Sequence, residues 1–133
     1  RFLYQAINDG KIIYYGDGSE IREYINVIDA AKNSVQILAD EYENQNILFT
    51  GQYPMRVSEL FAMIKEILNR DLIIEYKNPE GKNIEGHYTI TPYKFIPKMG
   101  KKLVSHCYTD MGQGLLLCMQ EIHDHIHHGG KEH

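Results

Sequence analysis

The residues best suited to bind a ligand lie in the stretch GDGSEIREYINVIDAA, residues 16–31. Its first four residues are typical of a tight turn, because glycine adopts positive φ at no steric cost and aspartate tolerates it. Arg22 follows closely, and a guanidinium carries several N–H donors in a fixed fork that suits a diphosphate. On the residues alone, the alternative is a solvated surface arginine paired with Glu20 or Glu23.

Histidines form the second group of candidate ligand-binding residues. His87 lies in the segment EGHYTITPYKF, whose aromatic and hydroxyl side chains suit a polar pocket or an ordinary connection between strands. Near the C-terminus, His123 and His127 are four residues apart, so one helical face can present both to a metal. No cysteine or carboxylate is placed to complete a tetrahedral site. We therefore predict no metal site, and a flexible histidine-rich tail over residues 123–133.

Motifs that carry catalysis are absent. The chain has no G-x-G-x-x-G and no G-x-x-x-x-G-K-[ST], which are the usual phosphate loops, and no G-x-S-x-G. No tyrosine is followed four residues later by lysine, so the proton-relay pair of short-chain dehydrogenases is missing. We predict no catalytic residue and no cofactor site in this chain.

The bulk properties indicate one globular domain over residues 1–133. Its net charge of −4 argues against nucleic-acid binding, which needs a basic face. No apolar run approaches the roughly 20 residues that span a membrane, and no signal peptide is recognisable. Cys107 and Cys118 stand eleven residues apart without a C-x-x-C motif, which favours a cytoplasmic location.

The elements that must position these residues alternate between strand and helix. We predict a helix ending at Gly10, helices from Ile28, over 57–68 and from Asp110, and strands over 11–15, 24–27, 47–50 and 72–76. Asp29 is the predicted N-cap of the second helix. The buried stripe of that helix is predicted to be Ile28, Ala31, Val35 and Leu38. This order indicates an α/β domain with a small mixed sheet flanked by helices.

The opening stretch closely resembles the segment GDG-x-x-x-R-[DE]-[FY]-[IV]-x-V-x-D-x-[AC] of extended short-chain dehydrogenase/reductases. These are the NAD-dependent sugar-nucleotide epimerases and dehydratases, such as UDP-glucose 4-epimerase. Further segments resemble the same family in the same order: NILFTGQYPMRVSELFAMIKEIL, LIIEYKN, YKFIPKMGKKL and DMGQGLLLCMQEI. The resemblance covers most of the chain, from about Lys11 to Ile122, and departs from the family at the segments TITPYKF and KMGKKL.

The resemblance implies that this chain is the C-terminal, substrate-binding lobe of such an enzyme, separated from the Rossmann half that holds NAD and the catalytic residues. Carried over by position, Arg22 contacts the nucleotide diphosphate. His87 stands near a second phosphate-binding arginine of many members, and a neutral imidazole is a weaker phosphate partner. No cofactor is implied for this chain alone, and NAD is implied for the full-length protein.

The implied partners are a nucleotide-sugar, with a UDP-sugar favoured, and the protein's own N-terminal Rossmann half. No nucleic acid or membrane partner is expected. Without the Rossmann half, the lobe is expected to expose a patch that favours a homo-oligomer. The alternative is a stand-alone, non-catalytic module for nucleotide-sugar binding or assembly. By either account we expect no turnover by this chain alone.

Overall fold

The computed structural model describes residues 1–77 and 100–128. In chain order its elements are α1 (Phe2–Asp9), β1 (Lys11–Tyr15), β2 (Ile21–Glu23), α2 (Val27–Gln36), the 3-10 turn η1 (Asp40–Tyr42), β3 (Ile47–Phe49), β4 (Pro54–Arg56), α3 (Val57–Leu68), β5 (Ile73–Lys77), β6 (Lys101–Leu103) and α4 (Met111–His128). Within the described ranges, no helix has the length and apolarity needed to cross a membrane.

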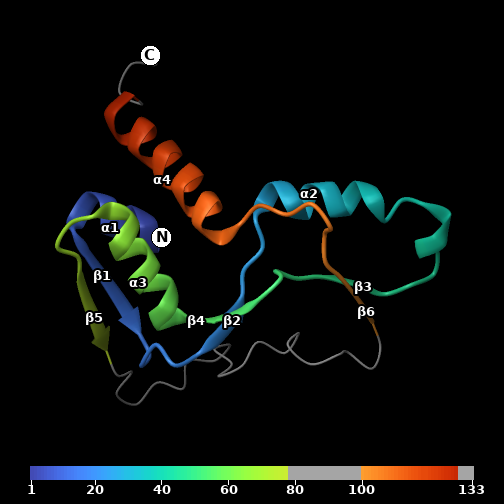
Figure 1. The fold of residues 1–133 in the computed structure, drawn as a ribbon, viewed down its shortest axis with the longest axis horizontal. Helices are drawn as coiled ribbons and strands as arrows, with labels where there is room; N and C mark the ends of the chain where they lie inside the picture. The colour runs from blue at the N-terminus through green and yellow to red at the C-terminus, as the bar shows by residue number, and fades with distance from the viewer. Residues whose placement is uncertain (78–99, 129–133) are drawn as a thin grey trace.

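One part of the molecule, which we call the core lobe, contains α1, β1, α3, β5 and α4. Strands β1 and β5 are parallel, with Lys11 opposite Ile73 and Tyr15 opposite Lys77, and the three helices gather beside them (Figure 1). The buried hydrophobic residues are Ala6, Ile12, Tyr14, Val57, Leu60, Phe61, Ile64, Leu72, Leu115 and Met119. The hydrophobic core therefore belongs mainly to this lobe.

Local sequence signals explain where the helices of the core lobe begin and end. Gly10 ends α1 in the left-handed conformation, with φ of 63°. At the start of α3, the Glu59 carboxylate accepts the N–H of Arg56 at 2.7 Å. After α3, the Arg70 guanidinium donates to the carbonyls of Ala6 and Ile7, which lie in the last turn of α1. Arg70 thereby ties the C-terminal end of α1 to the loop after α3.

A short antiparallel ribbon, β2–β4, leads out of the core lobe. Its register places Ile21 opposite Arg56 and Arg22 opposite Met55. Backbone bonds fix it to α3, because the N–H of Val57 donates to the carbonyl of Glu20 at 3.0 Å. The ribbon thus sets the position of Arg22 relative to the core.

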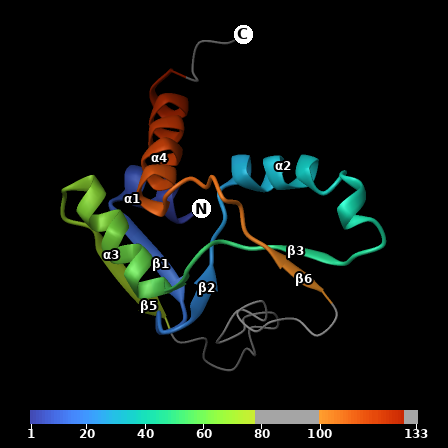
Figure 2. The ribbon, with the colours of Figure 1, turned by 45° about the vertical axis from the view of Figure 1, so that its right-hand side comes forward.

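The remaining part, which we call the arm, contains α2, η1, β3 and β6. Strands β3 and β6 are parallel, with Ile47 opposite Lys101 and Phe49 opposite Leu103. Both views show α2 standing to one side of the core lobe, with β3 and β6 beneath it (Figures 1 and 2). The Lys102 ammonium lies 2.9 Å from the buried Glu23 carboxylate, and this ion pair joins the arm to the β2–β4 ribbon.

The α/β class with parallel and antiparallel strands is confirmed, although the described strands form three separate pairs. The predicted strand over 24–27 is wrong, because the strand lies at Ile21–Glu23 and the chain then leaves it for a helix. The prediction that Asp29 caps that helix is also wrong. Asn26 is the N-cap, and its Oδ1 accepts the N–H of Ile28 at 2.9 Å. The amide reaches this donor because Asn26 is the last extended residue.

The predicted buried stripe of α2 is exposed. Five aliphatic residues, which we call the apolar stripe, face solvent: Val27, Ile28, Ala31 and Val35 on α2, and Leu38 just after it. The buried side of α2 carries Asp29 and Asn33 instead. The spacing of the apolar residues correctly predicts an amphipathic helix, but the polar side of α2 faces the interior.

Because the apolar side of α2 is exposed, truncating an aliphatic residue there should change the free energy of unfolding less than truncating one in the core. Ile64→Ala removes a fully buried side chain from α3 and should destabilise the chain by about 2–5 kcal/mol. Val35→Ala on α2 removes a side chain that is 70% exposed and should change the free energy of unfolding by less than about 0.5 kcal/mol. Urea unfolding measures both values, and equal losses would contradict the orientation of α2.

Candidate functional site

Arg22 occupies the middle of β2 and is half-buried. Its Nη1 donates to the carbonyl of Ile21 at 2.9 Å, which holds the guanidinium along the ribbon. Within the described residues it forms no ion pair with a carboxylate. Glu23, one of the two partners that the surface interpretation required, is paired with Lys102 instead. A guanidinium has five N–H donors, so Arg22 retains donors that can bind a further acceptor.

Three tyrosines and Glu20 surround the base of the ribbon. Burial, and after it the nearby Glu20 carboxylate, raises the pKa of Tyr14 to about 12. Burial also raises the pKa of Tyr24, although the charge of Arg22 opposes the effect. Burial raises the pKa of Tyr76 as well. These phenols stay protonated at neutral pH, so they act as hydrogen-bond donors and not as bases.

The glycine turn before β2 is held by hydrogen bonds between its own residues. The Asp17 carboxylate accepts both the N–H and the hydroxyl of Ser19, at 2.8 and 2.6 Å, and these bonds lower the pKa of Asp17. Gly18 has φ of 80°, and its carbonyl accepts the N–H of Ser58 at 3.0 Å. The turn therefore anchors β2 to the start of α3 and carries a negative charge. It does not form a phosphate cradle.

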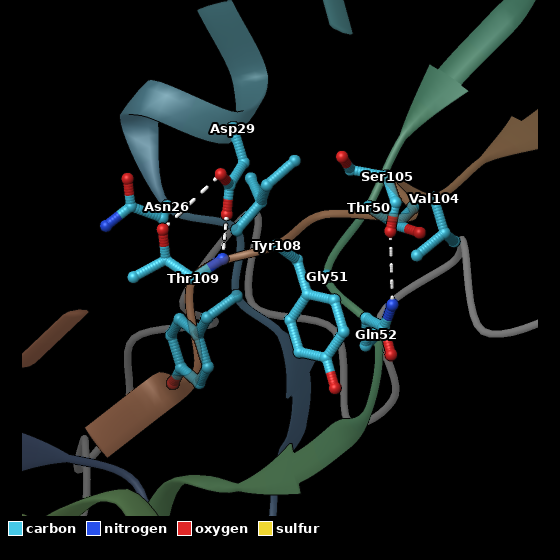
Figure 3. A pocket seen from close by; sticks show the side chains of 11 residues that line it. Asn26, Asp29, Thr50, Gly51, Gln52, Val104, Ser105, Tyr108 and Thr109 are labelled. Carbon is cyan, nitrogen blue, oxygen red and sulfur yellow. Dashed lines mark hydrogen bonds between the residues drawn. The ribbon is translucent and has the colours of Figure 1, made fainter. Parts of the chain in front are cut away.

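A small polar pocket lies where three connections meet, next to the ribbon (Figure 3). The connections are those from β2 to α2, from β3 to β4 and from β6 to α4. Its lining residues are Tyr24, Ile25, Asn26, Asp29, Thr50, Gly51, Gln52, Val104, Ser105, Tyr108 and Thr109. The cavity of about 30 Å³ has room for a water molecule and not for a nucleotide-sugar.

Asp29 organises one side of this pocket. Its carboxylate accepts the Thr109 N–H at 2.6 Å and lies 3.4 Å from the Thr109 hydroxyl, as the dashed lines in Figure 3 show. The Lys32 ammonium is 3.9 Å away. Asp29 also sits in the first turn of α2, where the helix dipole favours a negative charge. These contacts allow a carboxylate with 4% exposed side-chain surface to remain buried.

The other side of the pocket is held by Gln52, whose amide donates to the carbonyl of Ser105 at 3.2 Å (Figure 3). Gly51 approaches the Tyr24 backbone so closely that a Cβ would overlap it. The buried hydroxyl of Thr50 has no hydrogen-bond partner within the described residues. A water in the cavity would satisfy that hydroxyl. Sequence reasoning missed this set and singled out only Asp29, as a helix N-cap.

The other predicted site residue, His87, lies outside the described residues, as does the whole segment 85–95 that contains it. The described part of the histidine tail places the rings of His123 and His127 with centroids 4.3 Å apart. No group of three or more potential metal ligands occurs among the residues that the structure describes. Cys107 and Cys118 are free thiols.

The residues present do not fit an NAD site. The chain lacks the glycine fingerprint, and its glycine turn opens a strand rather than a helix whose N–H groups face a pyrophosphate. The Asp17 carboxylate within that turn disfavours a phosphate further. No step of hydride transfer is therefore assigned to these residues.

No family model matches the sequence, and no curated protein matches it. Solved structures do match its fold. UDP-glucuronic acid 4-epimerase from Bacillus cereus, in complex with UDP-4-deoxy-4-fluoro-glucuronic acid and NAD, is 14% identical with a TM-score of 0.73. The match covers 93% of this chain and 38% of that chain.

Two further enzymes match over similar lengths. GDP-L-fucose synthetase from Naegleria fowleri, bound to NADP, is 16% identical, with a TM-score of 0.64 over 95% of this chain and 37% of that one. TunA, an NAD-dependent NDP-hexosamine 5,6-dehydratase involved in tunicamycin biosynthesis, is 13% identical, with a TM-score of 0.64 over 90% of this chain and 37% of that one. The chain thus has the fold of a part of NAD-dependent sugar-nucleotide epimerases and dehydratases, and spans less than two fifths of their length.

The Asp29–Thr109 contact predicts graded effects of two substitutions. Asp29→Ala leaves the Thr109 N–H without its acceptor and should destabilise the chain by about 1–3 kcal/mol. Asp29→Asn retains an acceptor oxygen and should cost clearly less. Urea unfolding of the three proteins measures this order, and an equal cost for both variants would show that the charge, not the hydrogen bond, matters.

Tyr14 predicts how stability responds to alkaline pH. Below pH 10.0, the ordinary pKa, both the folded and unfolded states keep the phenol protonated, and its stabilisation is complete. As pH rises toward 12, only the unfolded state loses the proton, so the folded chain becomes less stable. Thermal midpoints should fall more steeply over this window for the native chain than for Tyr14→Phe. Parallel curves would contradict the raised pKa.

Proposed function

We propose that this chain is the nucleotide-sugar-binding lobe of an NAD-dependent sugar-nucleotide epimerase or dehydratase. Support comes first from its fold, which matches such enzymes over 90–95% of this chain. Support comes also from the sequence order of glycine turn, arginine and short helix, which folds into a rigid turn, a paired strand and a capped helix. The chain's share of the nucleotide-sugar enzyme is binding and orientation of the substrate.

The observation that carries the proposal is the setting of Arg22. The strand that holds it is paired on one side with β4 and joined by the Glu23–Lys102 ion pair to β6. Its guanidinium is half-buried and is not neutralised by a described carboxylate. A guanidinium in this position can bind a diphosphate favourably, because two parallel charge-assisted hydrogen bonds form without ordering a mobile side chain.

We assign the β- and α-phosphates of a UDP-sugar as the groups that Arg22 contacts. His87 is the proposed second contact, and its imidazole carries an N–H that can donate to a phosphate oxygen. Tyr24 follows directly after β2, the charge of Arg22 acts on its pKa, and its protonated hydroxyl is a suitable donor to a sugar or ribose hydroxyl.

The chemistry of the whole enzyme is outside these residues. NAD supplies the hydride acceptor for oxidation of a sugar hydroxyl in such enzymes. Tyr14, Tyr24 and Tyr76 have raised pKa values, whereas a base for that oxidation needs a lowered one. These three tyrosines therefore provide no base, and we expect this chain to bind substrate without turnover of its own.

The experiment is an NMR titration of the chain with UDP-glucuronic acid, which detects even millimolar binding. Arg22→Ala should weaken binding by about tenfold or more, since hydrogen bonds to a charged group contribute about 1.5–3 kcal/mol. Arg56→Ala is the matched control, because Arg56 lies on the neighbouring strand and on the opposite face of the ribbon. It should change affinity by less than about twofold.

The same titration with NAD is the second control, and we expect no binding. Equal loss of UDP-glucuronic acid binding in the two arginine variants would contradict the role of Arg22. Absence of nucleotide-sugar binding by the native chain would contradict the proposed function.

A further inference from the structure

The last turns of α4 carry a pair of histidines on one exposed face. His123 and His127 are four residues apart, so their side chains are neighbours along the helix. Their ring centroids are 4.3 Å apart, the ring planes are tilted by 51°, and both side chains are exposed. The helix thus brings two imidazole rings together at the surface.

The base of α4 fixes the helix that carries this pair. The Asp110 carboxylate accepts the N–H groups of Gly112 and Gln113 at the helix start, and Leu115 and Met119 are buried in the core lobe. Over residues 120–127 no side chain is buried. Both views show this end of α4 running away from the core lobe and from the β2–β4 ribbon (Figures 1 and 2). The two rings are therefore held by a rigid helix and are open to solvent.

The neighbouring Asp124 carboxylate favours one tautomer of His123. Its Oδ1 lies 3.5 Å from His123 Nδ1. A carboxylate beside Nδ1 favours the proton on that nitrogen, which leaves the lone pair of Nε2 free for a metal ion. Histidines that bind metals in proteins usually have a carboxylate or a carbonyl as such a partner. Asp124 thus prepares His123 as a ligand.

The spacing of the two rings fits coordination of a single ion. Two nitrogens that each lie about 2.0–2.1 Å from one ion are roughly 2.9–3.4 Å apart at coordination angles of about 90–109°. From ring centroids 4.3 Å apart, small rotations of the side chains bring one nitrogen of each ring to this separation. Imidazole ligands suit Cu²⁺, Ni²⁺ and Zn²⁺, whereas Mg²⁺ and Ca²⁺ prefer oxygen ligands.

The pair is an open site with two protein ligands. No group of three or more potential metal ligands occurs in the part of the chain that the structure describes. The sequence prediction of no metal site concerned a tetrahedral site, which lacks its cysteine or carboxylate ligands. A chelate of two histidines, with water in the remaining positions, does not require them.

We propose that His123 and His127 form a surface chelate for a divalent transition-metal ion of the class that prefers imidazole, with Cu²⁺ bound most tightly. The site lies on α4 and is separate from the nucleotide-sugar contact at Arg22. It therefore does not rest on the proposed function.

The test is a calorimetric titration of the chain with Cu²⁺ in buffer that contains glycine, a weak competing ligand that suppresses binding to single histidines. His123→Ala and His127→Ala should each weaken Cu²⁺ binding by about tenfold or more, because the second ligand of a chelate binds at a high effective concentration. The double variant should lose clearly less than the sum of the two single losses, because both substitutions remove the same site.

His125→Ala is the matched control for these variants. His125 is also exposed on α4, but at 100° per residue it lies about 160° around the helix from both members of the pair. Its substitution should change Cu²⁺ affinity by less than about twofold. Alanine is the best helix former, so none of these substitutions is expected to unfold α4.

Electron paramagnetic resonance of the equimolar Cu²⁺ complex gives a second readout. Two imidazole nitrogens should couple to the ion in the native chain, and one in each single variant of the pair. Equal weakening by His125→Ala, additive losses, a single coupled imidazole in the native chain, or no Cu²⁺ binding in glycine buffer would each overturn the proposal. None of these results depends on whether UDP-glucuronic acid binds.

Discussion

The buried carboxylate of Asp29 is the constraint on which the rest of the arm depends. It accepts the N–H of Thr109 at 2.6 Å, and so fixes the start of α2 to the chain just before α4. Because Asp29 must face inward, the aliphatic residues on the other side of α2 face outward. One hydrogen-bonded charge therefore sets the direction of α2, closes one wall of the small polar pocket and creates the apolar stripe.

The Arg22 ribbon and the apolar stripe are adjacent in sequence but differ in chemistry. Arg22 lies on a ribbon held by the core lobe, and the apolar stripe begins at Val27 on the arm. The residues between them carry the N-cap Asn26 and the close contact of Tyr24 with Gly51.

Local signals were sufficient to predict much of the core lobe from sequence. Gly10 marks the end of α1, and the spacing of Leu60, Phe61 and Ile64 identifies the buried face of α3, because these residues pack against elements in the same chain. The α/β class follows from the alternation of predicted strands and helices along the chain. The start of α4 was also predicted, and there the Asp110 carboxylate accepts the N–H groups of Gly112 and Gln113.

The arm was the part that sequence could not orient. Periodicity finds an apolar side on α2 but does not state what covers it, and Asp29 satisfies the rule for an N-cap as well as Asn26 does. The contact that decides between them joins residues 80 positions apart in the chain. The pocket was missed for the same reason, since Thr50, Gln52 and Ser105 become neighbours only after folding. The sequence predicted Arg22 as a ligand-binding residue beside a glycine turn. It could not show that Glu23 pairs with Lys102 and not with Arg22, because that ion pair is again a long-range contact.

The central claim is that a nucleotide-sugar binds at the Arg22 ribbon and not at the arm's apolar stripe. Hydrogen exchange, followed peptide by peptide in the presence and absence of UDP-glucuronic acid, tests it most directly. The account predicts slower exchange over residues 16–24 and unchanged exchange over residues 27–38. Unchanged exchange around Arg22, or slowing confined to α2, would contradict it.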